Sequence, residues 1–120
     1  MAHAAAGWPM EVCGLVARCP NGTLAVRPAR NLSDLPGTFL LDPAVLVASH
    51  RQGEVLIALY HSHCDAPAIL SAADRAAACL DGAPAWPGVA LWVVPVVAGV
   101  AGPPVCYTWN DTLADFTVRT

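Results

Sequence analysis

The residues that decide the fold of this chain run from Glu54 to His63 and read EVLIALYHSH. The apolar part of this stretch, residues 54–60, predicts a largely buried strand. Because alternate side chains of a strand point to the same face, His61 and His63 should present two imidazoles together at its carboxyl end. Sites of α/β proteins usually lie at that end of the strands. The stretch therefore predicts an α/β protein with a site built around two histidines.

A third candidate ligand follows in the segment from Ser71 to Asp74. Its spacing is that of a capping box at the start of a helix, which should end near Cys79. Such a helix would hold Asp74 rigidly in its first turn, and the loop over residues 64–70 could fold it back toward the strand end. Two imidazoles and one carboxylate leave the fourth position of a tetrahedral zinc ion for water, as in catalytic sites. Water in that position has a pKa of roughly 7.

Glu11 is the candidate for proton transfer. It opens the apolar stretch 11–17, which predicts a buried strand where an acid needs a special reason to be present. Peptide hydrolysis requires a group that takes a proton from water and returns it to the leaving amine. A carboxylate outside the metal shell is the usual solution.

Each of these features has a simpler interpretation when taken alone. A His-x-His pair on a strand is more often ordinary polarity, a Ser-x-x-Asp is usually a helix cap, and Glu11 could be a carboxylate at a helix-to-strand junction. Asp65 follows His63 by two residues and is an alternative third ligand, although it can equally shape the loop. Cys64 places a thiol beside the histidines that could compete for a metal, be oxidised, or have no role.

The joint spacing of these residues resembles the JAMM (MPN-plus) zinc metallopeptidases. The pattern of that family is a distant glutamate followed by His-x-His, seven residues, Ser, two residues and Asp, and this chain meets it without a gap. The segments from Pro9 to Leu15 and from Asn31 to Pro43 are also similar to the bacterial branch of the family. Two residues depart from the pattern, since Cys64 and Leu70 stand where proline is usual, so the loop should be less rigid.

The resemblance implies a layered α/β fold with a mixed β-sheet flanked by helices, similar to that of cytidine deaminases. It also implies one zinc ion held by His61, His63 and Asp74, with Glu11 as the general acid/base. Ser71 would hydrogen-bond the tetrahedral intermediate.

Length and composition limit what surrounds the site. With 120 residues, the chain should form one domain over residues 1–120. A net charge of −3 does not favour binding to nucleic acid, and no apolar run is long enough to cross a membrane. Five cysteines without paired spacing do not suggest a secreted disulfide framework, and no signal peptide is evident. A cytoplasmic protein is the simplest expectation.

The remaining elements follow from turn and capping signals. We expect a helix end over residues 2–8 and a hairpin of strands 11–18 and 23–27 around the turn at residues 20–22. A strand over residues 38–41 should lead through Asp42 as N-cap, with Pro43 as the first helical residue, into a helix that ends near Gly53. Further strands are expected over residues 89–97, 105–109 and 116–119.

The function that these expectations favour is a zinc-dependent peptidase or isopeptidase. By resemblance, it would cleave after the C-terminal tail of a ubiquitin-like or sulfur-carrier protein, and the extended tail could add to a strand edge beside the metal. Two alternatives stay open: a peptidase of the kind found in phage tail assembly, and a non-catalytic MPN scaffold that binds protein partners. An exposed sheet edge would also favour a homodimer.

Overall fold

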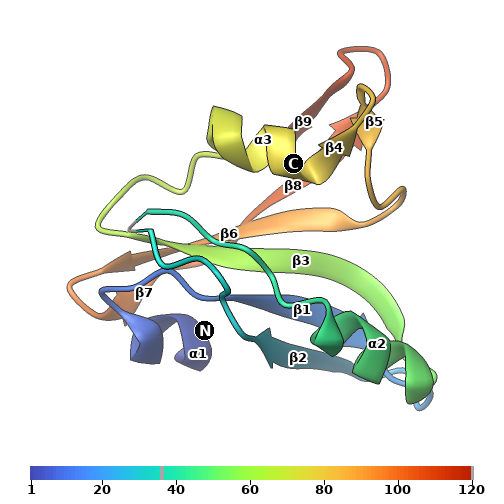
Figure 1. Ribbon diagram of the computed structural model, residues 1–120, viewed down its shortest axis with the longest axis horizontal. Helices are drawn as coiled ribbons and strands as arrows, with labels where there is room; N and C mark the ends of the chain where they lie inside the picture. The colour runs from blue at the N-terminus through green and yellow to red at the C-terminus, as the bar shows by residue number, and fades with distance from the viewer. Residues whose placement is uncertain (36, 120) are drawn as a thin grey trace.

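A mixed seven-stranded sheet forms the centre of the computed structural model, which describes residues 1–35 and 37–119 (Figure 1). Its strand order is β2-β1-β3-β6-β8-β9, and β7 pairs with β6. The strands of this sheet are β1 (Cys13–Arg18), β2 (Leu24–Ala29), β3 (Val55–Cys64), β6 (Ala90–Val97), β7 (Val100–Ala101), β8 (Val105–Asn110) and β9 (Asp115–Val118). The helices are α1 (Ala2–Gly7), α2 (Ala44–Arg51) and α3 (Ala72–Ala78). Helices flank the mixed sheet, so the predicted fold class is confirmed.

Strand β3 lies inside the sheet, antiparallel to β1 and parallel to β6. The register pairs His61 with Cys13 on one side and with Val93 on the other. Side chains of β3 alternate between the faces, so His61 and His63 share one face while Ser62 points to the other. Both histidines lie in the last four residues of the strand, at the carboxyl end where the sequence places them.

The two faces of the sheet are covered by different helices. On the histidine face, Leu70 and α3 pack on the core of β6 and β8, and Leu46 of α2 lies beside the same face. On the opposite face, Ala4 of α1 packs on Val94 and Val96. His3 Nδ1 also lies 2.7 Å from the hydroxyl of the buried Tyr60. The candidate site therefore lies on the side of α2 and α3.

Two predicted strands differ from the structure. Strand β1 begins at Cys13 and not at Glu11, because the ladder with β2 and β3 starts there. The strand predicted over residues 38–41 is wrong, since this segment makes only an isolated bridge between Asn31 and Leu41. The side chain of Asn31 bonds the backbone that a partner strand would otherwise pair, accepting from the N–H of Leu40 and donating to the carbonyl of Thr38.

The start of α2 is shifted by one residue. Pro43 is the N-cap, and Ala44 is the first helical residue. Asp42 still satisfies the helix start, because its Oδ1 accepts from the N–H of Ala44 at 3.0 Å. The helix ends as predicted, with Gln52 as its C-cap and Gly53 at φ 73°.

The other predicted elements are confirmed within one or two residues. The hairpin turn is fixed by Asn21, whose Oδ1 accepts from the N–H of Thr23 at 3.1 Å. The chain also contains a short hairpin of β4 (Cys79–Leu80) and β5 (Ala83–Pro84) that the sequence did not indicate, and β7 was not predicted either. Among the described residues, none of the helices is long and apolar enough to span a bilayer.

Candidate metal centre

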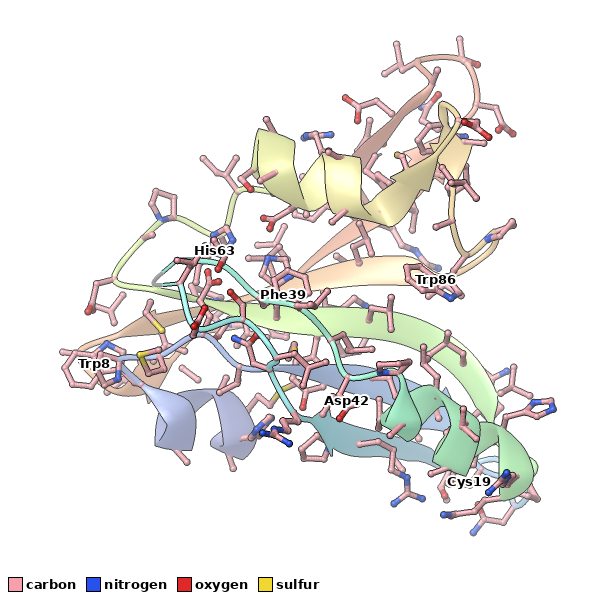
Figure 2. All side chains as sticks on the ribbon, viewed as in Figure 1. Trp8, Cys19, Phe39, Asp42, His63 and Trp86 are labelled. Carbon is pink, nitrogen blue, oxygen red and sulfur yellow. The ribbon has the colours of Figure 1, made fainter. Side chains whose placement is uncertain are left out.

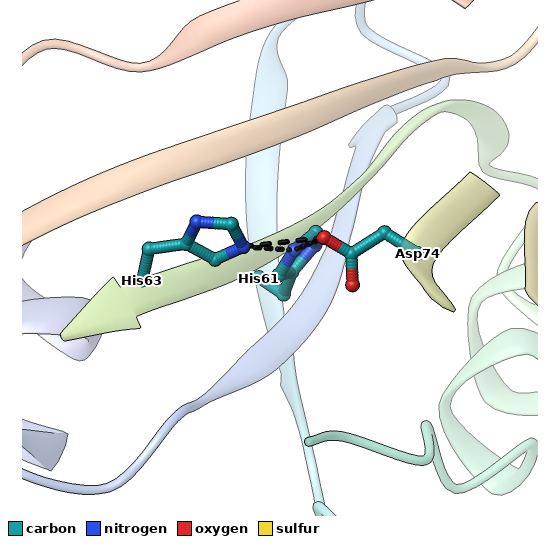
Figure 3. A group of neighbouring side chains, drawn as sticks. All are labelled: His61, His63 and Asp74. Carbon is teal, nitrogen blue, oxygen red and sulfur yellow. Dashed lines mark hydrogen bonds and ion pairs between the residues drawn. The ribbon is translucent and has the colours of Figure 1, made fainter. Parts of the chain in front are cut away.

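Three side chains converge at the end of β3 (Figure 3). His61 Nε2 lies 3.1 Å from His63 Nε2, and Asp74 Oδ2 lies 3.1 Å from the first nitrogen and 3.2 Å from the second. Ligand atoms at about 2.0–2.1 Å from a tetrahedral zinc ion lie about 3.3 Å apart. The three donor atoms therefore already have nearly the spacing that zinc requires.

Strand geometry and helix capping place these donors. His61 and His63 share a face because they are two residues apart on β3. Asp74 is the third residue of α3, and Ser71 is its N-cap. The N–H of Asp74 donates to Ser71 Oγ, and the N–H of Ser71 donates to Asp74 Oδ2, each at 3.0 Å. The cap interpretation and the ligand interpretation of Asp74 thus hold together, because the capping box aims the carboxylate at the histidines.

Neighbouring groups fix the imidazoles as well. His63 Nδ1 lies 2.8 Å from the carbonyl of Pro67, which can only accept a hydrogen bond. Nδ1 must therefore carry the proton, which leaves the Nε2 lone pair of neutral His63 for a metal. Phe39 stacks on the His61 ring at 4.3 Å between centroids, and His61 is 4 % exposed.

The electrostatics of the three groups suit a bound cation. Burial alone would raise the pKa of Asp74, but the hydrogen bonds from His61 and His63 hold it well below its usual range. The hydrogen bond to Asp74 raises the pKa of His63. A carboxylate and two imidazole nitrogens of this spacing form a suitable donor set for zinc, with a fourth position left open.

Glu11 and Ser71 lie around the same opening. They line a cavity of about 270 Å³ together with His63, Asp74 and Cys64. Burial raises the pKa of Glu11, while the two histidines oppose the rise and Asp74 adds to it. The structure thus brings all five predicted site residues, from three separate segments, to one place.

A second cavity of about 370 Å³ borders His61 and Asp74. Its walls are almost entirely apolar and include Phe39 and Trp86, of which Phe39 lies nearer to His63 (Figure 2). The donor group is therefore bordered by a polar opening on the Glu11 side and by an apolar channel on the α2 side.

The two alternative ligands have other positions. Asp65 Oδ2 accepts from the indole N–H of Trp8 at 2.8 Å, and its Oδ1 accepts from the N–H of Ala98 at 2.8 Å. It therefore shapes the loop and does not belong to the donor group. The thiol of Cys64 lies 3.4 Å from the carbonyl of Met10, and burial raises its pKa, which disfavours the thiolate.

Sequence reasoning missed three residues that hold the site. Asn31 bonds the carbonyl of Glu11, Ser62 bonds the neighbouring Val12, and Phe39 stacks on His61. The sequence motifs gave none of the three a role. Ser62 was missed because the His-x-His pattern specifies only the two histidines and leaves the residue between them open. An asparagine immediately before an irregular segment is the signal that could have indicated Asn31, since Asn side chains commonly bond the backbone of loops.

Comparison with known proteins identifies a matching family and relatives of known name. The family described as prokaryotic homologs of the JAB domain matches residues 1–110. Desampylase of Pyrococcus furiosus is 30% identical over 89 residues, which are 71% of this chain and 59% of that protein. Tail tip assembly protein K of Escherichia phage N15 is 43% identical over 77 residues, which are 63% of this chain and 31% of that protein. The matches thus span about a third to three fifths of these relatives.

Two solved structures share the fold. The solution structure of a protein from Salinibacter ruber has a TM-score of 0.66 and 24% identity, covering 99% of this chain and 81% of that one. A protein from Desulfitobacterium hafniense has a TM-score of 0.66 and 25% identity, covering 98% and 81%. These structures show the shared fold, and the family match over residues 1–110 confirms the resemblance found in the sequence: the chain belongs to the family of prokaryotic homologs of the JAB domain.

Proposed function

We propose that the chain is a zinc-dependent peptidase or isopeptidase that cleaves after the C-terminal tail of a ubiquitin-like or sulfur-carrier protein. The observation that carries the proposal is the donor triangle of His61, His63 and Asp74, whose sides are 3.1–3.2 Å, with Glu11 and Ser71 around the same opening. Similarity to a desampylase supports the class of activity.

Zinc in this site would lower the pKa of a bound water and polarise the scissile carbonyl. Glu11 would take the proton and return it to the leaving amine. Its pKa is raised by burial, which brings the proton affinity of the carboxylate closer to what a general base at neutral pH needs. Ser71 Oγ accepts from the N–H of Asp74, so its own O–H remains to donate to the developing oxyanion.

The substrate tail would enter as an extended strand. Both edges of β3 are already paired, with β1 and β6, so the tail cannot add to β3 itself. The backbone N–H and C=O of Phe39 have no hydrogen-bond partner among residues 1–35 and 37–119, and this residue stacks on His61. The segment around Phe39 is therefore the edge that we propose pairs with the tail, beside the apolar channel.

We further propose that the protein is located in the cytoplasm. All five cysteines are free thiols, as is usual in reducing compartments, which supports the cytoplasm. A protein substrate without nucleic-acid or membrane partners fits the net charge of −3. The homodimer stays a prediction.

Metal analysis and cleavage together test the proposal. Wild type and His63→Ala should be purified without added zinc and offered a fusion protein with a Gly-Gly tail. We expect near one zinc per chain in wild type, lost in the variant, with cleavage that a chelator abolishes. Absence of zinc from wild type would contradict the metal centre, whereas bound zinc without cleavage of any tailed substrate would favour a non-catalytic scaffold.

A second candidate function is peptide cleavage in phage tail assembly. The 43% identity to a tail tip assembly protein favours it, although the match covers 31% of that protein. The same residues would act, and only the substrate would differ. A panel that contains both Gly-Gly-tailed fusions and phage tail tip polypeptides separates the two, because the preferred class should be cleaved with the higher kcat/KM.

A further inference from the structure

Ser62 stands between the two histidines and points to the opposite face of the sheet. It is 0% exposed, and its Oγ lies 4.0 Å from Cys64 Sγ, a weak contact beside two shorter hydrogen bonds to Val12. Its Oγ accepts from the N–H of Val12, and its own N–H donates to the carbonyl of Val12, both at 2.9 Å. The first of these bonds needs a hydroxyl, so the pairing depends on the side chain and not only on the strand.

Val12 directly follows Glu11, and Glu11 lies outside the ladder that β1 forms with β3. Within the described part of the chain, the Glu11 carboxylate has no hydrogen-bond partner, and only the Glu11 carbonyl is held, by Asn31 Nδ2 at 3.2 Å. The position of the carboxylate therefore depends on how firmly its backbone is fixed. Ser62 provides the firmer of the two attachments.

We propose that Ser62 is a positioning residue that ties the backbone of Glu11 and Val12 to the strand that carries His61 and His63. The general base and two metal ligands then keep their spacing when the protein fluctuates. This inference rests on the proposed function only in naming Glu11 as the base. A displacement of about 1 Å between base and reacting atoms can cost about 100-fold in rate, so a fixed spacing matters.

Ser49 offers a matched control, because it is also a buried serine. Its Oγ donates to Glu54 Oε1 at 2.8 Å, away from the metal centre. The sequence contains two glutamates, Glu11 and Glu54, so carbon-13 labelling of glutamate gives one carboxyl signal for each. Ser62→Ala and Ser49→Ala therefore remove the same chemical group, one beside each reporter.

The experiment follows both carboxyl signals by NMR through a pH titration of protein stripped of metal. In Ser62→Ala we expect the Glu11 carboxylate to gain water, so its pKa falls toward the ordinary 4.5 while the Glu54 signal keeps its wild-type titration. In Ser49→Ala the pKa of Glu54 should rise, because a hydrogen bond to its charged form is lost, and Glu11 should not change. The charged groups that act on Glu11, namely His61, His63 and Asp74, are the same in all forms.

Zinc binding and kinetics extend the test. Ser62→Ala should bind zinc within about threefold of wild type, yet kcat should fall at least about tenfold with KM little changed. Ser62→Thr, which keeps the hydroxyl, should restore both kcat and the Glu11 titration. If the Glu11 signal of Ser62→Ala titrates as in wild type, or if Ser49→Ala alters it equally, Ser62 does not position Glu11.

Amide exchange covers the case in which Ser62→Ala does not fold. In wild type and Ser62→Thr, the amide proton of Val12 should exchange at least about tenfold more slowly than that of Glu11, whose N–H has no hydrogen-bond partner in the described chain. Free exchange at Val12 would overturn the inference. NMR and exchange need neither zinc nor substrate, so failure of the metallopeptidase proposal would be seen separately, as missing zinc or missing cleavage in wild type.

Discussion

Glu54 and Glu11, the two glutamates of the chain, lie at opposite ends of β3 and have opposite surroundings. The side chain of Glu54 is 2% exposed and is bonded by Arg27, Ser49 and Cys19. Glu11 is half-buried beside the metal centre, and the described chain offers its carboxylate no hydrogen bond. The pKa of Glu54 is lowered, chiefly by the hydrogen bond from Arg27, whereas burial raises the pKa of Glu11.

The contrast separates a structural carboxylate from a candidate catalytic one. The carboxylate of Glu54 is bonded from β2 and α2, which fixes the start of β3 against both elements and lowers the affinity of the carboxylate for a proton. Glu11 is desolvated without a hydrogen-bond partner in the described chain, and the nearby histidines offset the effect of burial only in part. Proteins keep such an unfavourable arrangement mainly at functional sites. Each of the following predictions changes one side of this comparison.

The largest effect is expected from Glu11→Gln. This variant keeps the shape of the side chain and removes its basicity, so kcat should fall by about 100-fold or more while zinc stays bound. Measurement of kcat and of zinc content on one preparation checks both parts. The matched Glu54→Gln should retain kcat at a temperature where it is folded, and equal losses in both variants would mean that Glu11 acts only through stability.

Glu54→Gln should show its effect in stability. Removing the charge leaves the guanidinium of Arg27 without its carboxylate partner, so Tm should fall by several degrees. Thermal unfolding of the two variants in parallel tests this, with Glu11→Gln expected at or above the Tm of wild type. A fall in Tm for Glu11→Gln as large as for Glu54→Gln would remove the distinction between the two carboxylates.

The pH dependence of these differences should have opposite signs. The folded pKa of Glu54 lies below its ordinary 4.5, so its contribution to stability is present above pH 4.5 and is lost as the pH falls through the folded pKa. The folded pKa of Glu11 lies above 4.5, so its contribution is present below pH 4.5 and is lost as the pH rises through the folded value.

Unfolding of metal-free protein between about pH 3 and 7 measures this. Relative to wild type, the Tm of Glu11→Gln should rise with pH, and that of Glu54→Gln should fall. Curves that run in parallel would show that the two environments do not differ as the structure has them.

The local parts of this fold and site could be predicted from the sequence. Alternation along β3 placed His61 and His63 together, and the Ser-x-x-Asp cap placed Asp74, because both rules act within a few residues. The spacing of the whole set then matched a known family.

The parts that failed depend on contacts between distant residues. The strand expected over residues 38–41 is absent because the side chain of Asn31 bonds this backbone instead of a partner strand. The start of β1 was placed two residues early because Glu11 and Val12 are held from Asn31 and Ser62 and not by the ladder with β2. Hydrophobic periodicity does not show which distant backbone groups such side chains will bond.

The smallest effect is expected from Cys64→Ser, which changes a second group at the Glu11 end of β3. The thiol lies 3.4 Å from the carbonyl of Met10, and a serine hydroxyl can donate to the same oxygen. Burial raises the pKa of the thiol, which disfavours a thiolate ligand. A catalytic zinc ion that is held by the two imidazoles and Asp74 needs no fourth donor from the protein. Zinc content should therefore be unchanged and kcat should stay within about threefold. Loss of zinc in Cys64→Ser would instead make the centre a four-ligand site, and a closed site of that kind has no position for the water on which Glu11 is proposed to act.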